Sequence, residues 1–274
     1  MSNNIRENSK GWITGLDTIR FVLAIIVLLG HANVFGPLDN INNDSLLFRL
    51  CKLFISNSFV GITAVIAFFV ISGLVIHYPY RNGKKINLPE YFVKRYLRVG
   101  IPMIIVAIMA YLLKVDPSDL PFWSLYCELI YYTLYPLVLW IMAKYKLSIE
   151  NVITGAFIIS YLFLFIHGQD VVAFLTQSKS RALSYHYMGI YWTWLLGFPC
   201  WLLGVRIAAK YDEIKANAIS EKRIVWIRLV TFGGSVFCSI AHFHLSLSYT
   251  ISMGLFSLLA SFWILNEIKF WSNR

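Results

Sequence analysis

Charged residues are scarce in this sequence. Asp, Glu, Lys and Arg make up only 14% of its 274 residues, whereas 58% are hydrophobic. A soluble domain has about 25% charged residues, so an ordinary soluble protein is excluded. The apolar residues form runs of roughly 18–20, the length at which an α-helix crosses a bilayer. Alternating segments of about ten residues, typical of an outer-membrane barrel, are missing. The sequence therefore predicts an all-α, polytopic helical bundle in a membrane.

Several other features are also missing. The cysteines (Cys51, Cys127, Cys200 and Cys238) have neither CxxC nor Cys/His spacing, so no metal site is predicted. The first sixteen residues are polar and no small-residue cleavage site follows, so no cleavable signal peptide is expected. There is no long linker and no internal repeat of the kind that marks many transporters. We therefore expect a single membrane-embedded domain over residues 1–274.

Hydropathy divides the chain into eight expected spans, and the basic residues lie mainly on one side of them. Eighteen Lys and Arg fall in loops and ends on the N-terminal side, against five on the other side. This asymmetry predicts that both termini are cytoplasmic. It also accounts for most of the net charge of +10, so we expect no nucleic-acid partner. The expected spans are 16–36, 57–78, 99–115, 123–143, 151–167, 189–208, 226–243 and 247–266.

The first span contains two ionisable residues, Arg20 and His31, whose placement inside a membrane costs free energy. Ionisable groups inside spans are usually functional. Eleven residues of helix separate the two by about 16 Å along the axis and about 20° around it, so both face the same way. Asp17 lies three residues before Arg20 and is placed to pair with it. In the alternative interpretation, Arg20 reaches the interface and His31 caps the outer end of the helix.

Glu128 lies one and a half turns into the span 123–143. Ser124, Glu128, Tyr131 and Tyr135 form a polar stripe on one helix face. A carboxylate there needs a partner, or it becomes protonated. The predicted topology puts Glu128 and His31 in the outer half of the membrane. We therefore expect them to meet, with Glu128 orienting His31 or sharing its proton.

Arg95 and Arg98 precede the third span, on a short amphipathic helix expected to begin near Asn87–Glu90. Their i, i+3 spacing makes the two guanidinium groups project together. Such a pair at a membrane surface suits a polyphosphate, because each group can bind bidentately. Contact with anionic lipid headgroups is the alternative. Pro102 is expected in the first turn of the following span, where a missing N–H costs little.

Four short motifs in this order resemble those of the acyltransferase family 3 membrane proteins. Each is weak alone, but together they cover roughly residues 12–140, and the later spans fit in hydropathy only. The motifs are Leu16-Asp17-Thr18-Ile19-Arg20 followed by His31, Phe68-Phe69-Val70-Ile71-Ser72-Gly73, Arg95-Tyr96-Leu97-Arg98 with Pro102, and Trp123-Ser124-Leu125 with Glu128.

The resemblance implies transfer of an acyl group, usually acetyl from acetyl-CoA, to a hydroxyl of a glycan or lipid-linked saccharide. It implies a catalytic His31, supported by Arg20 on the same helix. Arg95 and Arg98 would contact the CoA phosphates, and Glu128 would be a further site residue. The expected location is the bacterial inner membrane, in contact with its lipids. Family members usually have further spans after this point, so the chain looks short at its C-terminus.

Two other functions are compatible with the sequence. In a proton-coupled transporter or permease, His31, Arg20 and Glu128 would form a proton relay. The absence of a repeat and of helix pairs broken by glycine or proline counts against it. Alternatively, the chain is an inactive, truncated family member. The sequence identifies neither the acceptor nor the oligomeric state.

Overall fold

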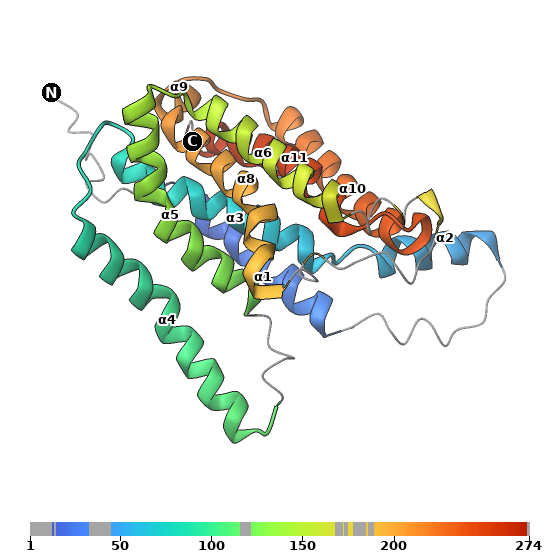
Figure 1. Cartoon of the computed structure of the whole chain (residues 1–274). Coiled ribbons are helices and arrows are strands. Elements are labelled where there is room, and N and C mark those ends of the chain that lie inside the picture. Colours follow the sequence, from blue (N-terminus) through green and yellow to red (C-terminus); the bar gives the residue numbers. More distant parts are fainter. Residues whose placement is uncertain are drawn as a thin grey trace, which may run out of the picture.

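The computed structural model describes residues 13, 15–32, 45–115, 122–167, 172, 175–177, 185 and 189–272. Throughout these residues the regular structure is helical, and seven helical segments are long and apolar enough to cross a membrane. The predicted all-α membrane fold is therefore confirmed (Figure 1). The helices are α1 (Leu16–His31), α2 (Leu46–Ser56), α3 (Gly61–His77), the 3-10 turn η2 (Tyr78–Tyr80), α4 (Leu88–Leu112), α5 (Trp123–Tyr145), α6 (Ile149–His167), α8 (Gly189–Ala209), α9 (Tyr211–Lys215), α10 (Glu221–Leu245) and α11 (Tyr249–Ser272).

The first and third expected spans differ from the helices observed in ways that concern the site. Helix α1 has 16 residues, and the rest of its expected span, 33–36, lies outside the described residues. The expected short helix and third span are instead one continuous helix, α4. Pro89 stands in its first turn, where the sequence predicted a helix start, whereas Pro102 lies inside the helix and not in the first turn of a span. Arg95 and Arg98 therefore belong to the same rigid element as the transmembrane part.

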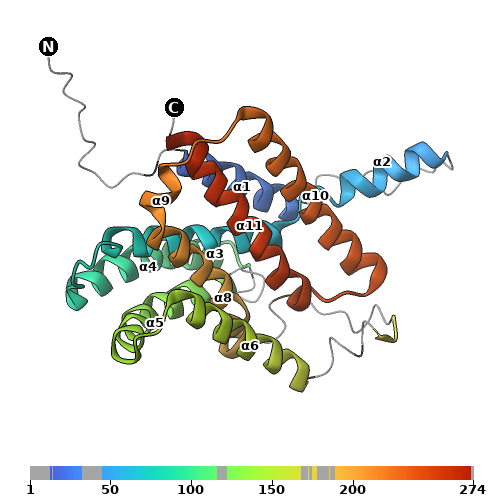
Figure 2. The same ribbon diagram turned by 90° about the horizontal axis from the view of Figure 1, so that it is seen from above.

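Helix α3 forms the centre of the bundle and packs most extensively against α8. Figure 2 shows these two helices between α1, α10 and α11 on one side and α4, α5 and α6 on the other. Glycines let their backbones touch: a Cβ at Gly204 would lie 1.8 Å from the Val70 carbonyl oxygen, and one at Gly73 would lie 2.0 Å from that of Trp201. Small residues of this kind are what close helix packing in a membrane requires.

Helix α4 leans away from the rest of the bundle (Figure 1). Its main packing partner is α5, and only Tyr91, Val99 and Ala110 of its 25 residues are buried. A space therefore remains between α4 and the central helices. This space holds the candidate site.

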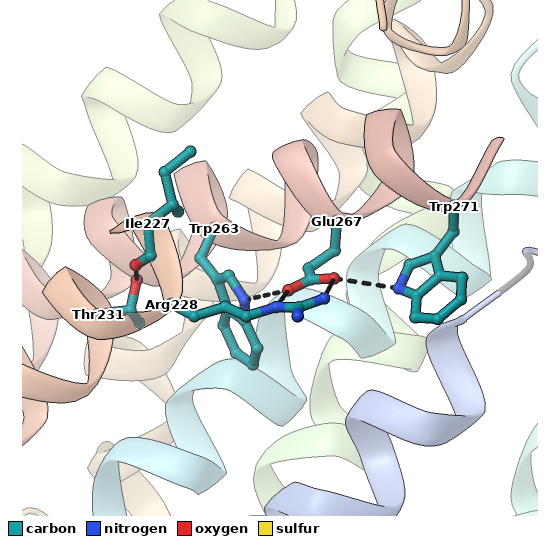
Figure 3. A network of polar contacts seen from close by, with 6 residues as sticks. All are labelled: Ile227, Arg228, Thr231, Trp263, Glu267 and Trp271. Carbon is teal, nitrogen blue, oxygen red and sulfur yellow. Dashed lines mark hydrogen bonds and ion pairs between the residues drawn. The ribbon is translucent and has the colours of Figure 1, made fainter. Parts of the chain in front are cut away.

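A buried carboxylate joins the last two helices. Glu267 of α11 is 2% exposed and accepts hydrogen bonds from Arg228 Nε (2.6 Å) and Nη2 (2.8 Å), which come from α10. The indole N–H groups of Trp263 (2.8 Å) and Trp271 (3.1 Å) complete its shell (Figure 3). Each carboxylate oxygen thus has two donors, which compensates for removing the charge from water.

The same network reaches the start of α1. A Cβ at Gly15 would lie 2.4 Å from the Trp271 ring, and Gly15 has φ +81°, a conformation that glycine adopts without strain. Glycine is therefore required here both for its backbone angle and for the space that the indole fills. Helix α11 thereby fixes where α1, which carries Arg20 and His31, begins.

Candidate active site

A cavity of about 400 Å³ lies between α1, α3, α4 and α5. Its walls are mostly apolar, but polar side chains reach it from all four helices. Arg20 comes from α1, Ser72 from α3, Arg95 and Arg98 from α4, and Ser124, Glu128 and Tyr132 from α5. Four of the five site residues predicted from the sequence therefore line one cavity.

Glu128 is held in this cavity by two hydroxyl groups. Its Oε1 accepts a hydrogen bond from Ser72 Oγ at 2.5 Å and another from the Tyr132 hydroxyl one turn along α5. Ser72 is in turn contacted by the indole N–H of Trp201 on α8, at 3.2 Å. Ser72, Tyr132 and Trp201 are all buried, so the carboxylate has a fixed position on a rigid support.

Arg20 forms the predicted pair with Asp17, with Nη1 3.3 Å from Oδ1. The two side chains are 28% and 55% exposed, which makes this a weak, partly solvated ion pair. The guanidinium has five N–H donors, and this contact uses only its Nη1 group. Arg20 therefore keeps the capacity to bind an anion in the cavity.

Three arginines stand where this cavity meets a second one. The second cavity, of about 330 Å³, also includes Arg20, Arg95 and Arg98 in its lining. Asp17, Tyr78 and Pro79 belong to the second cavity only, so it opens toward the end of the bundle at which α1 begins and α3 ends. Three guanidinium groups at one junction create a strongly positive entrance that suits phosphate groups.

His31 lies at the other end of α1. Its Nδ1 is 2.8 Å from the Val27 carbonyl oxygen, and its side chain is exposed. It stands beside the start of α3, since a Cβ at Gly61 would lie 3.8 Å from His31 Cε1. His31 is absent from the lining of the cavity that holds Arg20 and Glu128.

The prediction that Glu128 lies at the depth of His31 is wrong. Glu128 contacts Ser72, which is eleven residues, or about 16 Å, along α3 from the glycine beside His31. The reason is the start of α5, where Trp123 packs against Phe69 in the middle of α3, with ring centroids 6.3 Å apart. One and a half turns later, the chain has reached the depth of Arg20.

Sequence reasoning missed the residues that hold the carboxylate. The motif that contains Ser72 does not predict its contact with Glu128, and the polar stripe predicted on this span does not include Tyr132. Tyr131, which was assigned to it, turns away to donate to the Trp194 carbonyl oxygen at 3.0 Å. The i, i+4 spacing of Glu128 and Tyr132 was the available signal. Within the described residues, no group of His, Cys, Asp and Glu is arranged to hold a metal ion.

Comparison with known proteins adds one result. The family model of an acyltransferase domain, that of acyltransferase family 3, matches residues 13–273. The match extends over nearly the whole chain, including the later helices in which the sequence motifs were absent. No curated protein and no solved structure matches the sequence.

Proposed function

Because the chain belongs to acyltransferase family 3, we propose that this membrane acyltransferase is an O-acetyltransferase. It would move an acetyl group from acetyl-CoA to a hydroxyl of a cell-surface or exported saccharide. The observation that carries the proposal is the junction of three arginines at the mouth of a cavity with a fixed carboxylate. In the bacterial inner membrane, this entrance would face the cytoplasm, where CoA is found.

The arginines are suited to hold the donor. CoA carries a diphosphate and a further phosphate, and Arg95 and Arg98 project together from one helix toward Arg20 on another. Guanidinium groups bind phosphate oxygens bidentately and keep their charge at any physiological pH. In this proposal the phosphates stay at the entrance, and the long pantetheine arm enters the cavity with the thioester at its end.

His31 is the proposed general base. Because Nδ1 faces the Val27 carbonyl oxygen, it carries the proton, and Nε2 is left as the basic nitrogen. Nε2 would take the proton from the acceptor hydroxyl as its oxygen attacks the thioester carbonyl. The new C–O bond forms, the C–S bond breaks, and the imidazolium returns the proton to the CoA thiolate.

The depth of Glu128 supports a role on the donor side of the proposed reaction. It lies about 16 Å from the level of His31 and shares the cavity with Arg20. We therefore propose that Glu128 accepts hydrogen bonds from the amide N–H groups of the pantetheine arm. It would then direct the thioester toward His31 and take no part in orienting the imidazole.

The test is acetyl transfer by His31→Ala. Membranes containing the variant at the same level as the natural protein should transfer no label from acetyl-CoA. The host's surface saccharides should also lack the mass of one acetyl group. Full activity of His31→Ala would overturn the assignment of the base. Proton-coupled uptake in proteoliposomes, independent of CoA, would overturn the proposed reaction and support the permease.

A further inference from the structure

Another basic pocket, separate from the two cavities of the candidate active site, lies on the side of α11 that faces away from α1. It takes no part in the proposed reaction. It has a volume of about 450 Å³ and is bounded by α8, α9 and α11. Arg206, Lys210 and Lys269 supply its positive charge, and Glu213 is the carboxylate in its lining. We propose that this pocket binds one anionic phospholipid of the membrane leaflet on the basic side of the bundle.

The head of the pocket has donors available for a phosphate. Arg206 Nε (2.9 Å) and Lys210 Nζ (2.8 Å) both contact one oxygen of Glu150, which belongs to α6. This carboxylate holds the two cations side by side. A guanidinium has five N–H donors and an ammonium three, so these contacts use only part of their capacity. The lining holds three cations and one carboxylate, so its charge is positive, which suits the anionic phosphodiester of a lipid headgroup.

An apolar wall leads away from the charged end of the pocket. Leu258, Phe262, Leu265 and Lys269 are spaced i, i+4, i+7 and i+11, and all four line the pocket, so they form one stripe on α11. The apolar part of this stripe, from Leu258 to Leu265, is about 10 Å long, so it fits within one leaflet, whose share of a bilayer's hydrocarbon core is about 15 Å. Leu258 and Phe262 are 47% and 48% exposed, so the stripe is open to the membrane.

The pocket has charge at one end and apolar surface along the remainder, so it suits a lipid better than a free anion. A soluble phosphate would use the cations alone and leave the stripe bare. A neutral, zwitterionic lipid would cover the stripe but carries no net charge to complement the cations. Basic pockets between helices at the cytoplasmic surface are a known way to select anionic lipids.

The experiment is native mass spectrometry of the full-length protein in detergent, titrated with phosphatidylglycerol or phosphatidylcholine of the same chain length. We expect phosphatidylglycerol adducts at several-fold lower lipid concentration. Lys269→Gln should weaken phosphatidylglycerol binding about fivefold, as expected for loss of one basic group at an anionic headgroup. Phe262→Ala, which leaves every charge in place, should also weaken it. Lys222→Gln removes the same charge at the exposed start of α10 and should have no effect.

Three results would overturn the proposal. The first is equal binding of the two lipids, and the second is an equal loss in Lys222→Gln, which would indicate a general charge effect. The third is full displacement of phosphatidylglycerol by inorganic phosphate together with unchanged phosphatidylglycerol binding in Phe262→Ala. That result would show a site for a soluble anion. Thermal unfolding without added lipid shows whether each variant is folded. Acetyl transfer does not enter the readout, so the outcome is independent of the proposed function.

Discussion

Ser72 on α3 donates a hydrogen bond to Glu128 on α5, with 2.5 Å between Ser72 Oγ and Glu128 Oε1. This contact fixes the depth of the carboxylate relative to the central helix. It separates the ionisable residues of the site into two levels: Arg20, Arg95, Arg98 and Glu128 share a cavity, and His31 stands alone near the other end of α1.

Glu128→Gln should impair use of the donor more than use of the acceptor. Glutamine keeps the shape of the side chain and one acceptor oxygen, but it loses the charge that strengthens each hydrogen bond. We expect kcat/KM for acetyl-CoA to fall about tenfold to a hundredfold, since one charge-assisted hydrogen bond contributes about 1.5–3 kcal/mol. Initial rates at varied donor concentration measure this. A variant with unchanged donor kinetics would limit the carboxylate to a structural role.

Arg95→Gln and Arg98→Gln should each raise KM for acetyl-CoA about tenfold, with a smaller effect on kcat. The physical reason is the loss of a bidentate phosphate contact at the cavity entrance. Lys94→Gln is the matched control, because Lys94 lies on the same helix but pairs with Glu90 outside the cavity. An equal rise of KM in all three variants would favour general contact with anionic lipid headgroups over a donor site.

Gly204→Ala should destabilise the bundle. The added Cβ would lie 1.8 Å from the Val70 carbonyl oxygen, and both atoms are held by helices, so α3 and α8 must separate. Overpacking of this kind costs about 1–3 kcal/mol. Gly155→Ala is the control, since its added Cβ would meet nothing within 4 Å beyond its chain neighbours and the backbone of its own helix. Thermal unfolding in detergent should show a lower midpoint for Gly204→Ala only; equal midpoints would contradict the backbone contact.

Glu267→Gln should lower the free energy of unfolding by about 3 kcal/mol. This is the lower end of the range for breaking a buried ion pair. The lower end applies because Glu267 is 2% exposed but Arg228 is 41% exposed, so the arginine left unpaired is partly solvated. The double variant Arg228→Met with Glu267→Met should recover part of this loss, since no unpaired charge remains. Glu90→Gln breaks an exposed pair with Lys94 and should leave stability nearly unchanged, because solvent screens such a pair. No recovery in the double variant would show that the two tryptophan contacts carry the stability.

The sequence was sufficient for the fold class and for four of the polar residues that line the cavity. Apolar runs of spanning length predicted the helices, and the i, i+3 spacing of Arg95 and Arg98 predicted their joint projection, which holds because both lie on α4. The pairing of Arg20 with Asp17 followed from the same local geometry. These features depend on a single helix, so spacing alone determines them.

The relative positions of residues on different helices could not be predicted from spacing. The depth of Glu128 depends on where α5 begins relative to α3, which is set by packing of Trp123 against Phe69. The sequence does not mark Glu267 as a buried residue, because hydropathy ends the last span at residue 266, whereas α11 extends to Ser272. Its carboxylate is tolerated there only because Arg228 and two tryptophans lie within reach, and their proximity is a tertiary property.

The contact of Trp271 with Gly15 has a consequence for the order of assembly. Residues near the beginning of α1 meet their partner only after α11 has been synthesised and inserted. Until then the helix that bears Arg20 and His31 lacks the indole against which its first turn rests. This contact of α1 therefore forms only when the last described helix is in place, after the contacts that α1 makes with α3.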